Sequence, residues 1–135
     1  MERPASPVLD LLIEQYAKDI VDTHARFGDA TVIVKPESLL EVMEALRDGR
    51  GFEFDMLTDL TAVDYLGQTP RFEMVYHLYS LAKNHRLRVK TRVPQVAATD
   101  PSFDGHEFVI ASVAKIWPAA NWLEREVWDM YGISF

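Results

Sequence analysis

Two neighbouring runs of alternating polar and apolar residues constrain the fold of this sequence more than any other feature. In the run Arg86–Val93, basic residues alternate with apolar ones and threonine, and the run Arg71–Ser80 also alternates. The short connection between the two runs predicts an antiparallel pair. A third extended segment, Phe54–Tyr65, precedes a turn at residues 67–70. The middle of the chain is therefore expected to form a sheet with one face on a core.

Segments with helical spacing lie on both sides of this sheet region. The first helix is expected to start at Ser6-Pro7 and to stop at Gly28-Asp29, with Leu9, Leu12, Ile13, Tyr16 and Ile20 on its apolar stripe. A short strand, Ala30–Val34, should follow. A second helix should then run from Pro36 to Asp48-Gly49, burying Leu39, Val42, Met43 and Leu46. A final helix is expected from about Ala119 to Tyr131.

This order of elements predicts an α+β fold. We expect residues 1–135 to form a single two-layer domain, with a mixed or mostly antiparallel sheet and helices packed on one face. Ser112 is expected to cap a helical turn that reaches Trp117, before Pro118 breaks it. Residues 94–108 should form a loop.

Composition excludes several functional classes. The chain has 135 residues and no cysteine, which excludes disulfides, thiolate zinc sites and cysteine-ligated iron–sulfur clusters. Its 21 acidic and 14 basic residues give a net charge of −7, which disfavours nucleic acid as a partner. No apolar run is long enough for a membrane span, and the N-terminal residues lack a signal-peptide pattern. The isolated chain is therefore expected to be soluble.

Catalytic and metal-binding patterns are also missing from the sequence. His24, His77, His85 and His106 do not have the spacing of metal ligands. The acids Asp55, Asp59 and Asp64 are interrupted by apolar residues and do not form a calcium loop, and we expect them to serve in turns and caps. The glycines form no phosphate-binding loop, and no serine lies in a nucleophile elbow.

A basic stripe is the strongest electrostatic feature of the sequence. It consists of Arg86, Arg88, Lys90 and Arg92, which share one face of a strand. Residues 1–70 carry a net charge of −8 and residues 71–135 a net charge of +1. The stripe binds either an acidic protein partner or an anionic headgroup surface, or it is simply the solvated face of a strand whose charges protect a sheet edge.

The C-terminal helix is dense in aromatic and charged residues. Spacing predicts that Leu123, Val127 and Met130 face the core. Trp122, Glu126 and Asp129 share a second stripe. We expect some of the charged residues Glu124, Arg125, Glu126 and Asp129 to have no partner within the chain and to bind another protein. Because Arg125 can pair with only one or two carboxylates, at least one acid should be exposed, together with Trp122, Trp128 or Tyr131.

The same segment resembles a known family. The residues Glu124-Arg125-Glu126, Asp129, Gly132-Ile133 and Phe135 match the pattern E-R-E-x-x-D-φ-φ-G-I-x-F of the 30-kDa subunit of respiratory complex I, which is also called its C subunit. Residues 117–122, 60–65 and 72–80 also resemble this family. In the family the motif continues beyond the position of Phe135 into an extension over the quinone-site subunit, which we expect to be absent here.

The resemblance implies an accessory, non-catalytic subunit of the peripheral arm of a proton-translocating NADH:quinone oxidoreductase. The implied partners are the quinone-site subunit, also called the D subunit, and the iron–sulfur subunits B and I. This subunit would bind no cofactor itself, whereas the complex carries FMN and iron–sulfur clusters, and the expected location is the cytoplasmic side of the cell membrane. The implied interface residues are Trp122, Glu124, Arg125, Glu126, Asp129 and Tyr131. One alternative is the equivalent subunit of a membrane-bound hydrogenase or F420-dependent relative, and another is a small enzyme that uses Asp59 and Asp64.

Overall fold

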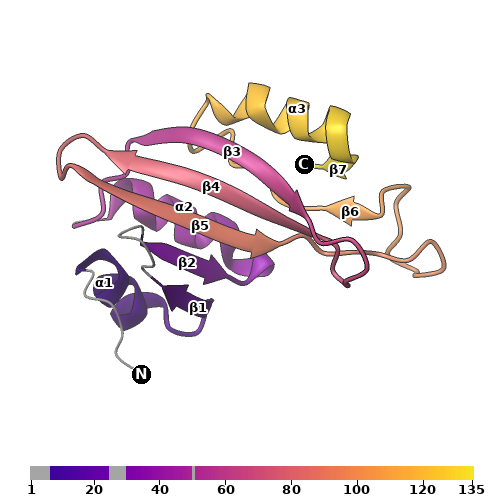
Figure 1. Ribbon diagram of the computed structural model, residues 1–135, viewed down its shortest axis with the longest axis horizontal. Coiled ribbons are helices and arrows are strands. Elements are labelled where there is room, and N and C mark those ends of the chain that lie inside the picture. Colours follow the sequence, from indigo (N-terminus) through magenta and orange to yellow (C-terminus); the bar gives the residue numbers. More distant parts are fainter. Residues whose placement is uncertain (1–6, 25–29, 50) are drawn as a thin grey trace.

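A five-stranded mixed sheet forms the centre of the protein (Figure 1). The computed structural model describes residues 7–24, 30–49 and 51–135. The strand order is β1-β2-β5-β4-β3, in which β2 and β5 run parallel and all other neighbours are antiparallel. The strands are β1 (Ile20–His24), β2 (Thr31–Val34), β3 (Met56–Asp64), β4 (Phe72–Ser80) and β5 (His85–Arg92). The predicted α+β class and mixed sheet are thus confirmed.

Helices cover one face of this sheet. The helical elements are α1 (Pro7–Tyr16), the short 3-10 helix η2 (Pro36–Ser38), α2 (Leu39–Asp48) and α3 (Ala120–Tyr131). In Figure 1, α2 lies behind the sheet, and α3 runs along β3. A separate parallel pair, β6 (Phe108–Val109) and β7 (Ile133–Ser134), ties the end of the chain to the loop before α3.

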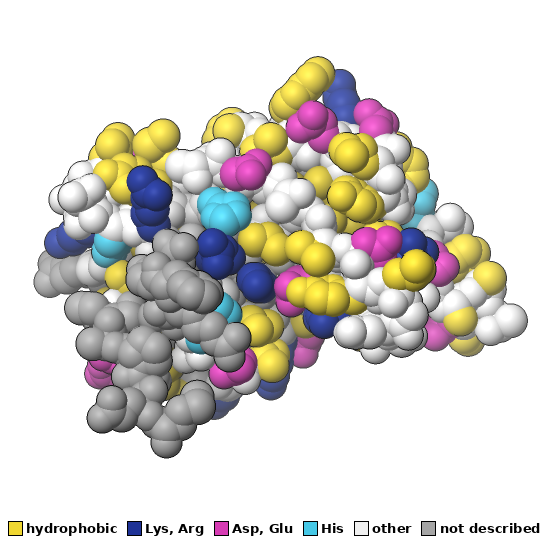
Figure 2. Space-filling model, viewed as in Figure 1, with side chains coloured by type: hydrophobic (Ala, Val, Ile, Leu, Met, Phe, Trp, Pro, Cys, Tyr) yellow, Lys and Arg dark blue, Asp and Glu magenta, His cyan; other side chains and the backbone are white. Residues whose placement is uncertain are grey.

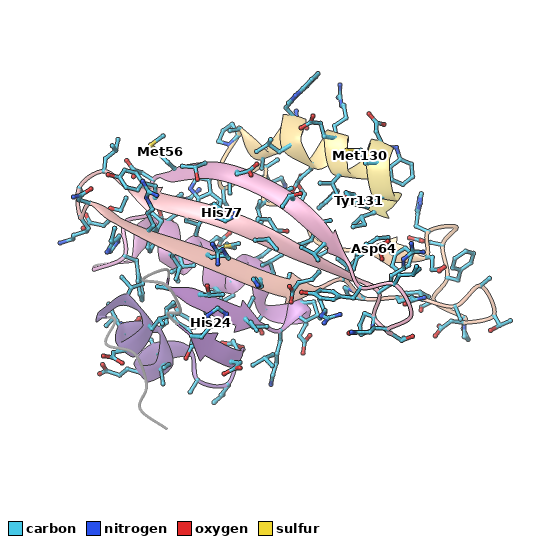
Figure 3. All side chains as sticks on the ribbon, viewed as in Figure 1. His24, Met56, Asp64, His77, Met130 and Tyr131 are labelled. Carbon is cyan, nitrogen blue, oxygen red and sulfur yellow. The ribbon has the colours of Figure 1, made fainter. Side chains whose placement is uncertain are left out.

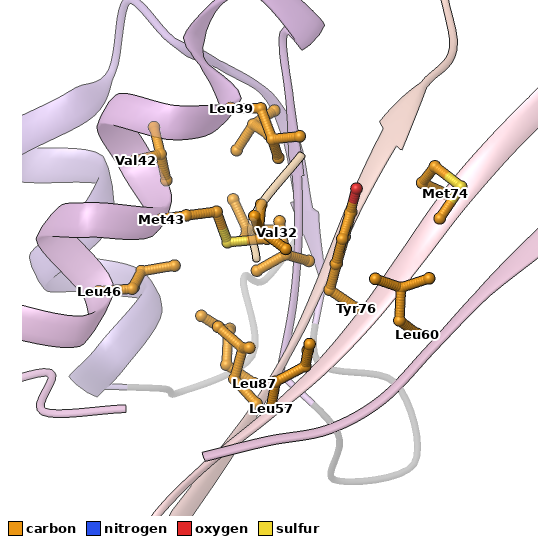
Figure 4. Packing of buried hydrophobic residues seen from close by; sticks show 14 of the residues in the cluster. Val32, Leu39, Val42, Met43, Leu46, Leu57, Leu60, Met74, Tyr76 and Leu87 are labelled. Carbon is orange, nitrogen blue, oxygen red and sulfur yellow. The ribbon is translucent and has the colours of Figure 1, made fainter. Parts of the chain in front are cut away.

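The core lies between the sheet and the helices, as the residue alternation predicts. On β4, Met74, Tyr76 and Leu78 are buried, and on β5 Leu87 and Val89 belong to the same hydrophobic cluster. In Figure 4, Tyr76 lies between the side chains of α2 and Met74. The predicted apolar stripe of α2 is confirmed, since Leu39, Val42, Met43 and Leu46 are fully buried. Side chains of the opposite register on β4 and β5 point to the helix-free face.

The first helix is shorter than the sequence predicts. α1 ends at Tyr16, where the Asp19 amide donates a hydrogen bond to the Tyr16 carbonyl, and Ile20 begins β1 instead of extending the helix. The segment Ile20–His24 contains β-branched residues and pairs with β2, so strand pairing overrides the helical spacing. The predicted N-cap Ser6 and the predicted stop at Gly28-Asp29 lie outside the described residues.

The prediction for the C-terminal segment is confirmed in its boundaries. The Ser112 hydroxyl accepts a hydrogen bond from the Ala114 amide at 3.1 Å and caps a short turn, as expected. The Trp117 ring nitrogen then donates to the Phe54 carbonyl at 3.0 Å, which fixes the start of α3 over the core. α3 ends at Gly132, which has φ +72° and therefore occupies the left-handed region that favours glycine.

The strand that carries the basic stripe is not an edge strand. β5 lies between β2 and β4, so protection of a sheet edge does not explain its charges. The edges of the sheet are β1 and β3. The period-2 pattern identifies the face of a strand but contains no information on its neighbours, which explains why the edge interpretation was wrong.

Candidate functional site

The buried face of α3 differs from the expected one. Ala120, Glu124 and Val127 are buried, and Leu123 and Tyr131 are half-buried. Met130 is 74% exposed, so the prediction that it faces the core is wrong. The inward stripe follows positions 120, 124, 127 and 131. Hydrophobic spacing did not identify it, because position 124 holds a carboxylate.

Glu124 anchors α3 to the preceding loop. Its carboxylate accepts a hydrogen bond from the Ser112 hydroxyl at 2.6 Å and another from the Val113 amide at 2.9 Å. Burial raises the pKa of the Glu124 carboxyl above its ordinary value, while these two hydrogen bonds oppose the shift. Glu124 is therefore not among the exposed charged residues of α3, because its hydrogen-bond partners are provided by the chain itself.

A second buried group lies within the electrostatic reach of Glu124. The Tyr76 hydroxyl has no hydrogen-bond partner among the described residues, and its side chain is fully buried. Burial, together with the negative charge of Glu124, raises the pKa of the Tyr76 phenol. A deprotonated Tyr76 is consequently disfavoured, and both groups belong to the interior below α3.

The outer face of α3 is the candidate functional site. Trp122 is 66% exposed and Trp128 45% exposed, and the neighbouring Arg125, Glu126 and Asp129 are all exposed. No ion pair joins these three charged side chains to one another or to another residue in the described part of the chain. The prediction of an exposed carboxylate beside an uncovered tryptophan is confirmed. Figure 2 shows hydrophobic and charged side chains intermixed over α3.

Aromatic contacts mark the two flanks of this surface, which we call the α3 face and define as Trp122, Arg125, Glu126, Trp128, Asp129 and Met130. The Trp128 ring contacts the His106 ring edge-to-face at 5.7 Å, so the loop before β6 borders one flank. Tyr131 turns inward, and its ring packs edge-to-face on Phe72 at 5.6 Å. Tyr131 is therefore mainly a packing residue, whereas most of the Trp122 side chain is exposed.

The basic stripe divides into two parts. Lys90 and Arg92 lie near the buried Glu73, with nitrogen–oxygen distances of 4.0 and 3.6 Å. The Arg92 guanidinium also stacks on the Tyr65 ring at 4.1 Å. Arg86 is exposed at the other end of the strand, and Arg88 is half-buried. In Figure 3, His77 projects from the middle of β4 on the same face, and Figure 2 shows basic side chains over this area.

The carboxylates considered for catalysis have structural partners. Asp64 forms a bidentate ion pair with Arg71, with both distances 2.7 Å, and this pair holds the Asp64 pKa below its ordinary value. Asp59 accepts a hydrogen bond from the Leu60 amide, and Asp55 accepts one from the Leu81 amide. Within the described ranges, no group of three or more His, Asp or Glu side chains could hold a metal ion. Nor does any helix of those ranges have the length and apolarity needed to cross a membrane.

Sequence reasoning missed two clusters that the fold assembles. The first is the Glu124–Ser112 anchor, and its only signal was an acid at a core position of the helix. The second joins Tyr65, Glu73 and Arg92, which come from the turn after β3, from β4 and from β5. Each of these residues alternates correctly in its own segment, but only the register of the strands brings them together.

Comparison with known proteins places this geometry in a family. The family model described as "Respiratory-chain NADH dehydrogenase, 30 Kd subunit" matches residues 32–135. A protein of Citrifermentans bemidjiense, named as the C subunit of NADH-quinone oxidoreductase, is 44% identical over 124 residues, which cover 92% of this chain and 70% of that protein. The protein of the same name from Rhodobacter capsulatus is 41% identical, and the match covers 90% of this chain and 56% of its own length.

A solved structure has the same fold. It comes from the membrane-bound sulfane sulfur reductase, described as an archaeal respiratory membrane complex, and aligns with a TM-score of 0.73. The alignment covers 95% of this chain and 68% of the other chain, at 23% sequence identity. The chain therefore shares the fold of that protein, and the match to the family model shows that it belongs to the family of 30-kDa subunits of the respiratory-chain NADH dehydrogenase.

Proposed function

We propose that this chain is an accessory, non-catalytic subunit in the peripheral arm of a proton-translocating NADH:quinone oxidoreductase, on the cytoplasmic side of the membrane. Its proposed partners are the quinone-site subunit and the iron–sulfur subunits B and I. The observation that carries the proposal is the α3 face, where two exposed tryptophans surround charged residues without local partners in the described ranges. Membership of the family supports the same assignment.

The composition of the α3 face is suited to protein binding. Tryptophan and arginine are enriched among the residues that dominate interface energies, and Trp122 and Arg125 are both exposed here. Glu126 and Asp129 exceed Arg125 by one negative charge, so a complementary surface would offer a basic group beside an apolar pocket. We assign this contact to the quinone-site subunit.

We further infer that the chain contributes surface and holds no redox cofactor of its own. The absence of cysteine supports this inference, because thiolates are the usual ligands of iron–sulfur clusters. The purified chain, mixed with NADH and a water-soluble quinone, should give no NADH oxidation above the rate without protein. A protein-dependent rate that follows chain concentration would contradict the non-catalytic role.

The exposed end of the basic stripe, at Arg86, is a separate proposed contact. Lys90 and Arg92 are near Glu73, so the exposed charge that an acidic partner would meet first is Arg86. Exposed charges at the rim of an interface act mainly on the rate of association. This contact would steer docking, whereas the α3 face would provide most of the affinity.

Co-assembly with the proposed partners tests the function directly. The chain would be co-expressed with the quinone-site subunit and the two iron–sulfur subunits of its own organism, and the dissociation constant measured after purification. Trp122→Ala should weaken binding about 30-fold or more, and Arg125→Ala should weaken it strongly if Arg125 becomes a buried pair in the complex. The control Lys35→Ala changes an exposed cation elsewhere and should leave binding unchanged. Wild-type affinity in both α3 variants would reject the proposal.

The electron donor of the parent complex is a property of other subunits. The names of the relatives favour NADH, so genes for an NADH-binding flavoprotein are expected beside the gene for this chain. Genes for a hydrogenase large subunit in that place would assign the chain to a hydrogenase relative instead.

A further inference from the structure

We propose that the turn between β3 and β4 forms a second contact with the partner bound at the α3 face, in which Leu66 enters an apolar pocket and Arg92 acts as a positioning residue. This inference rests on the proposed function and identifies a further part of the same interface. The turn comprises residues 66–71, and Leu66 is 77% exposed.

Backbone and side-chain contacts hold this turn closed. The Tyr65 amide donates to the Arg71 carbonyl at 2.8 Å, and the Gln68 amide donates to the Tyr65 carbonyl at 2.9 Å. The bidentate pair of Arg71 with Asp64 joins the two ends of the turn, with both distances 2.7 Å. Leu66 is therefore presented on a segment whose ends are fixed by neighbouring strands.

Arg92 connects the turn to the sheet below it. Its guanidinium stacks on the Tyr65 ring at 4.1 Å, and its Nη1 donates to the Pro70 carbonyl at 3.0 Å. Its Nε lies 3.6 Å from the carboxylate of Glu73, which also accepts a hydrogen bond from the Tyr65 hydroxyl at 3.1 Å. The planar guanidinium thus contacts Tyr65 and Pro70, at the two ends of the turn, and also the buried carboxylate of Glu73. A lysine ammonium could not stack on the ring and make these other contacts at the same time.

The position of the turn connects it with the α3 face. Figure 3 shows Met130 and Tyr131 at the end of α3 above Asp64, the last residue of β3, and Leu66 follows Asp64 by two residues. Val63, also at this end of β3, is 37% exposed, and Met130 is 74% exposed. A single exposed leucine needs no explanation, but here three exposed apolar side chains belong to the same end of the molecule.

Because contacts with Arg92 already order the turn in the free chain, binding a partner costs less conformational entropy. A flexible turn loses conformational entropy when a partner immobilises it, and a turn already held by Arg92 loses less. The pair Asp64–Arg71 is internally neutralised, while Glu126 and Asp129 on the α3 face leave an excess of negative charge. The matching partner surface is therefore an apolar pocket with a basic rim on a neighbouring subunit, not a second copy of this acidic chain.

Leu66→Asp tests the contact, and Leu81→Asp is its matched control. Leu81 is 63% exposed on the turn between β4 and β5, at the opposite end of the β4 strand. In the co-assembled complex, Leu66→Asp should weaken binding about 30-fold, whereas Leu81→Asp should stay within about twofold of the wild type. Equal losses in the two variants, or wild-type binding by Leu66→Asp, would overturn the inference.

A double-mutant cycle tests the role of Arg92. Arg92→Lys retains the positive charge but loses the stacking on Tyr65 and the hydrogen bond to the Pro70 carbonyl, so it should weaken binding about fivefold and speed amide hydrogen exchange in residues 65–69 of the free chain. In the Leu66→Asp background, the same change should have little further effect on binding. Additive losses would show that Arg92 does not act through Leu66 and would overturn its positioning role.

Trp122→Ala separates this inference from the proposed function. Weak binding by Trp122→Ala together with normal binding by Leu66→Asp would leave the α3 interface standing and remove the second contact. Normal binding by both variants would contradict both the α3 interface and the contact at Leu66. Loss in both, with the Leu81→Asp control intact, supports an interface that extends from α3 across the end of β3.

Discussion

The carboxylate of Glu124 should contribute to the stability of the chain more than any exposed acid of α3. Glu124→Ala removes the acceptor for the Ser112 hydroxyl and for the Val113 amide. Val113 is completely buried, so its amide loses a partner in the interior of the protein. A buried donor left without an acceptor costs about 1–3 kcal/mol, and with the second hydrogen bond we expect a loss of about 2–4 kcal/mol.

Thermal unfolding of the purified chain measures this loss. For a chain of this size, the expected change in unfolding free energy corresponds to a decrease in Tm of roughly 10 °C. The control Glu126→Ala changes the same residue type two positions along the same helix, where the side chain is exposed. It should alter the unfolding free energy by no more than about 0.5 kcal/mol. If both variants melt together with the wild type, the anchor has no energetic role.

The pH dependence of unfolding provides a second measurement on the same residue. The pKa of Glu124 is raised in the folded chain, so its protonation favours folding. This contribution is fully present below the carboxyl pKa of the unfolded chain and is lost as the pH rises through the folded pKa. The Tm advantage of the wild type over Glu124→Gln should therefore grow when the pH falls from 7 to 5. An advantage that shrinks over this range would show that the folded environment stabilises the ionised form.

The remaining predictions concern the basic stripe and the end of α3. Arg86→Glu combined with Arg88→Glu should slow complex assembly at low salt and lose this effect as ionic strength rises, which stopped-flow association would measure. Arg92→Glu should instead lower the Tm by several degrees, because it places a second acid beside the buried Glu73, and an unchanged melting curve would contradict that role. Gly132→Ala should cost about 1 kcal/mol in a denaturant titration, because Gly132 has φ +72° and no neighbouring atom blocks a methyl group there.

Local patterns predicted the sheet and the second helix because each element satisfies its own periodicity. The alternation on β4 and β5 identified the core face, and the stripe of α2 is fully buried. The first helix was overextended because Ile20 fits a helical stripe equally well. Only pairing with β2, which the sequence between them does not reveal, makes Ile20 part of a strand.

The candidate site was predictable in part for a related reason. Spacing on α3 identified an exposed aromatic and charged surface, and Trp122, Arg125, Glu126 and Asp129 lie on it. Spacing did not identify the partner of Glu124, because Ser112 and Val113 lie on a loop whose path depends on the pairing of β6 with β7. The cluster around Arg92 was hidden for the same reason, since it requires the register of three separate segments.

Adjacent residues of one short motif therefore have different physical roles. Successive residues of a helix are rotated by about 100°, so Glu124 can point into the core while Arg125 and Glu126 point outward. The inward carboxylate fixes α3 to the loop before it, and the outward residues form the proposed interface. Because the two functions share one helix, a Glu124 variant should weaken partner binding only through the position of the α3 face. A variant of Arg125 should weaken binding while leaving the melting curve unchanged.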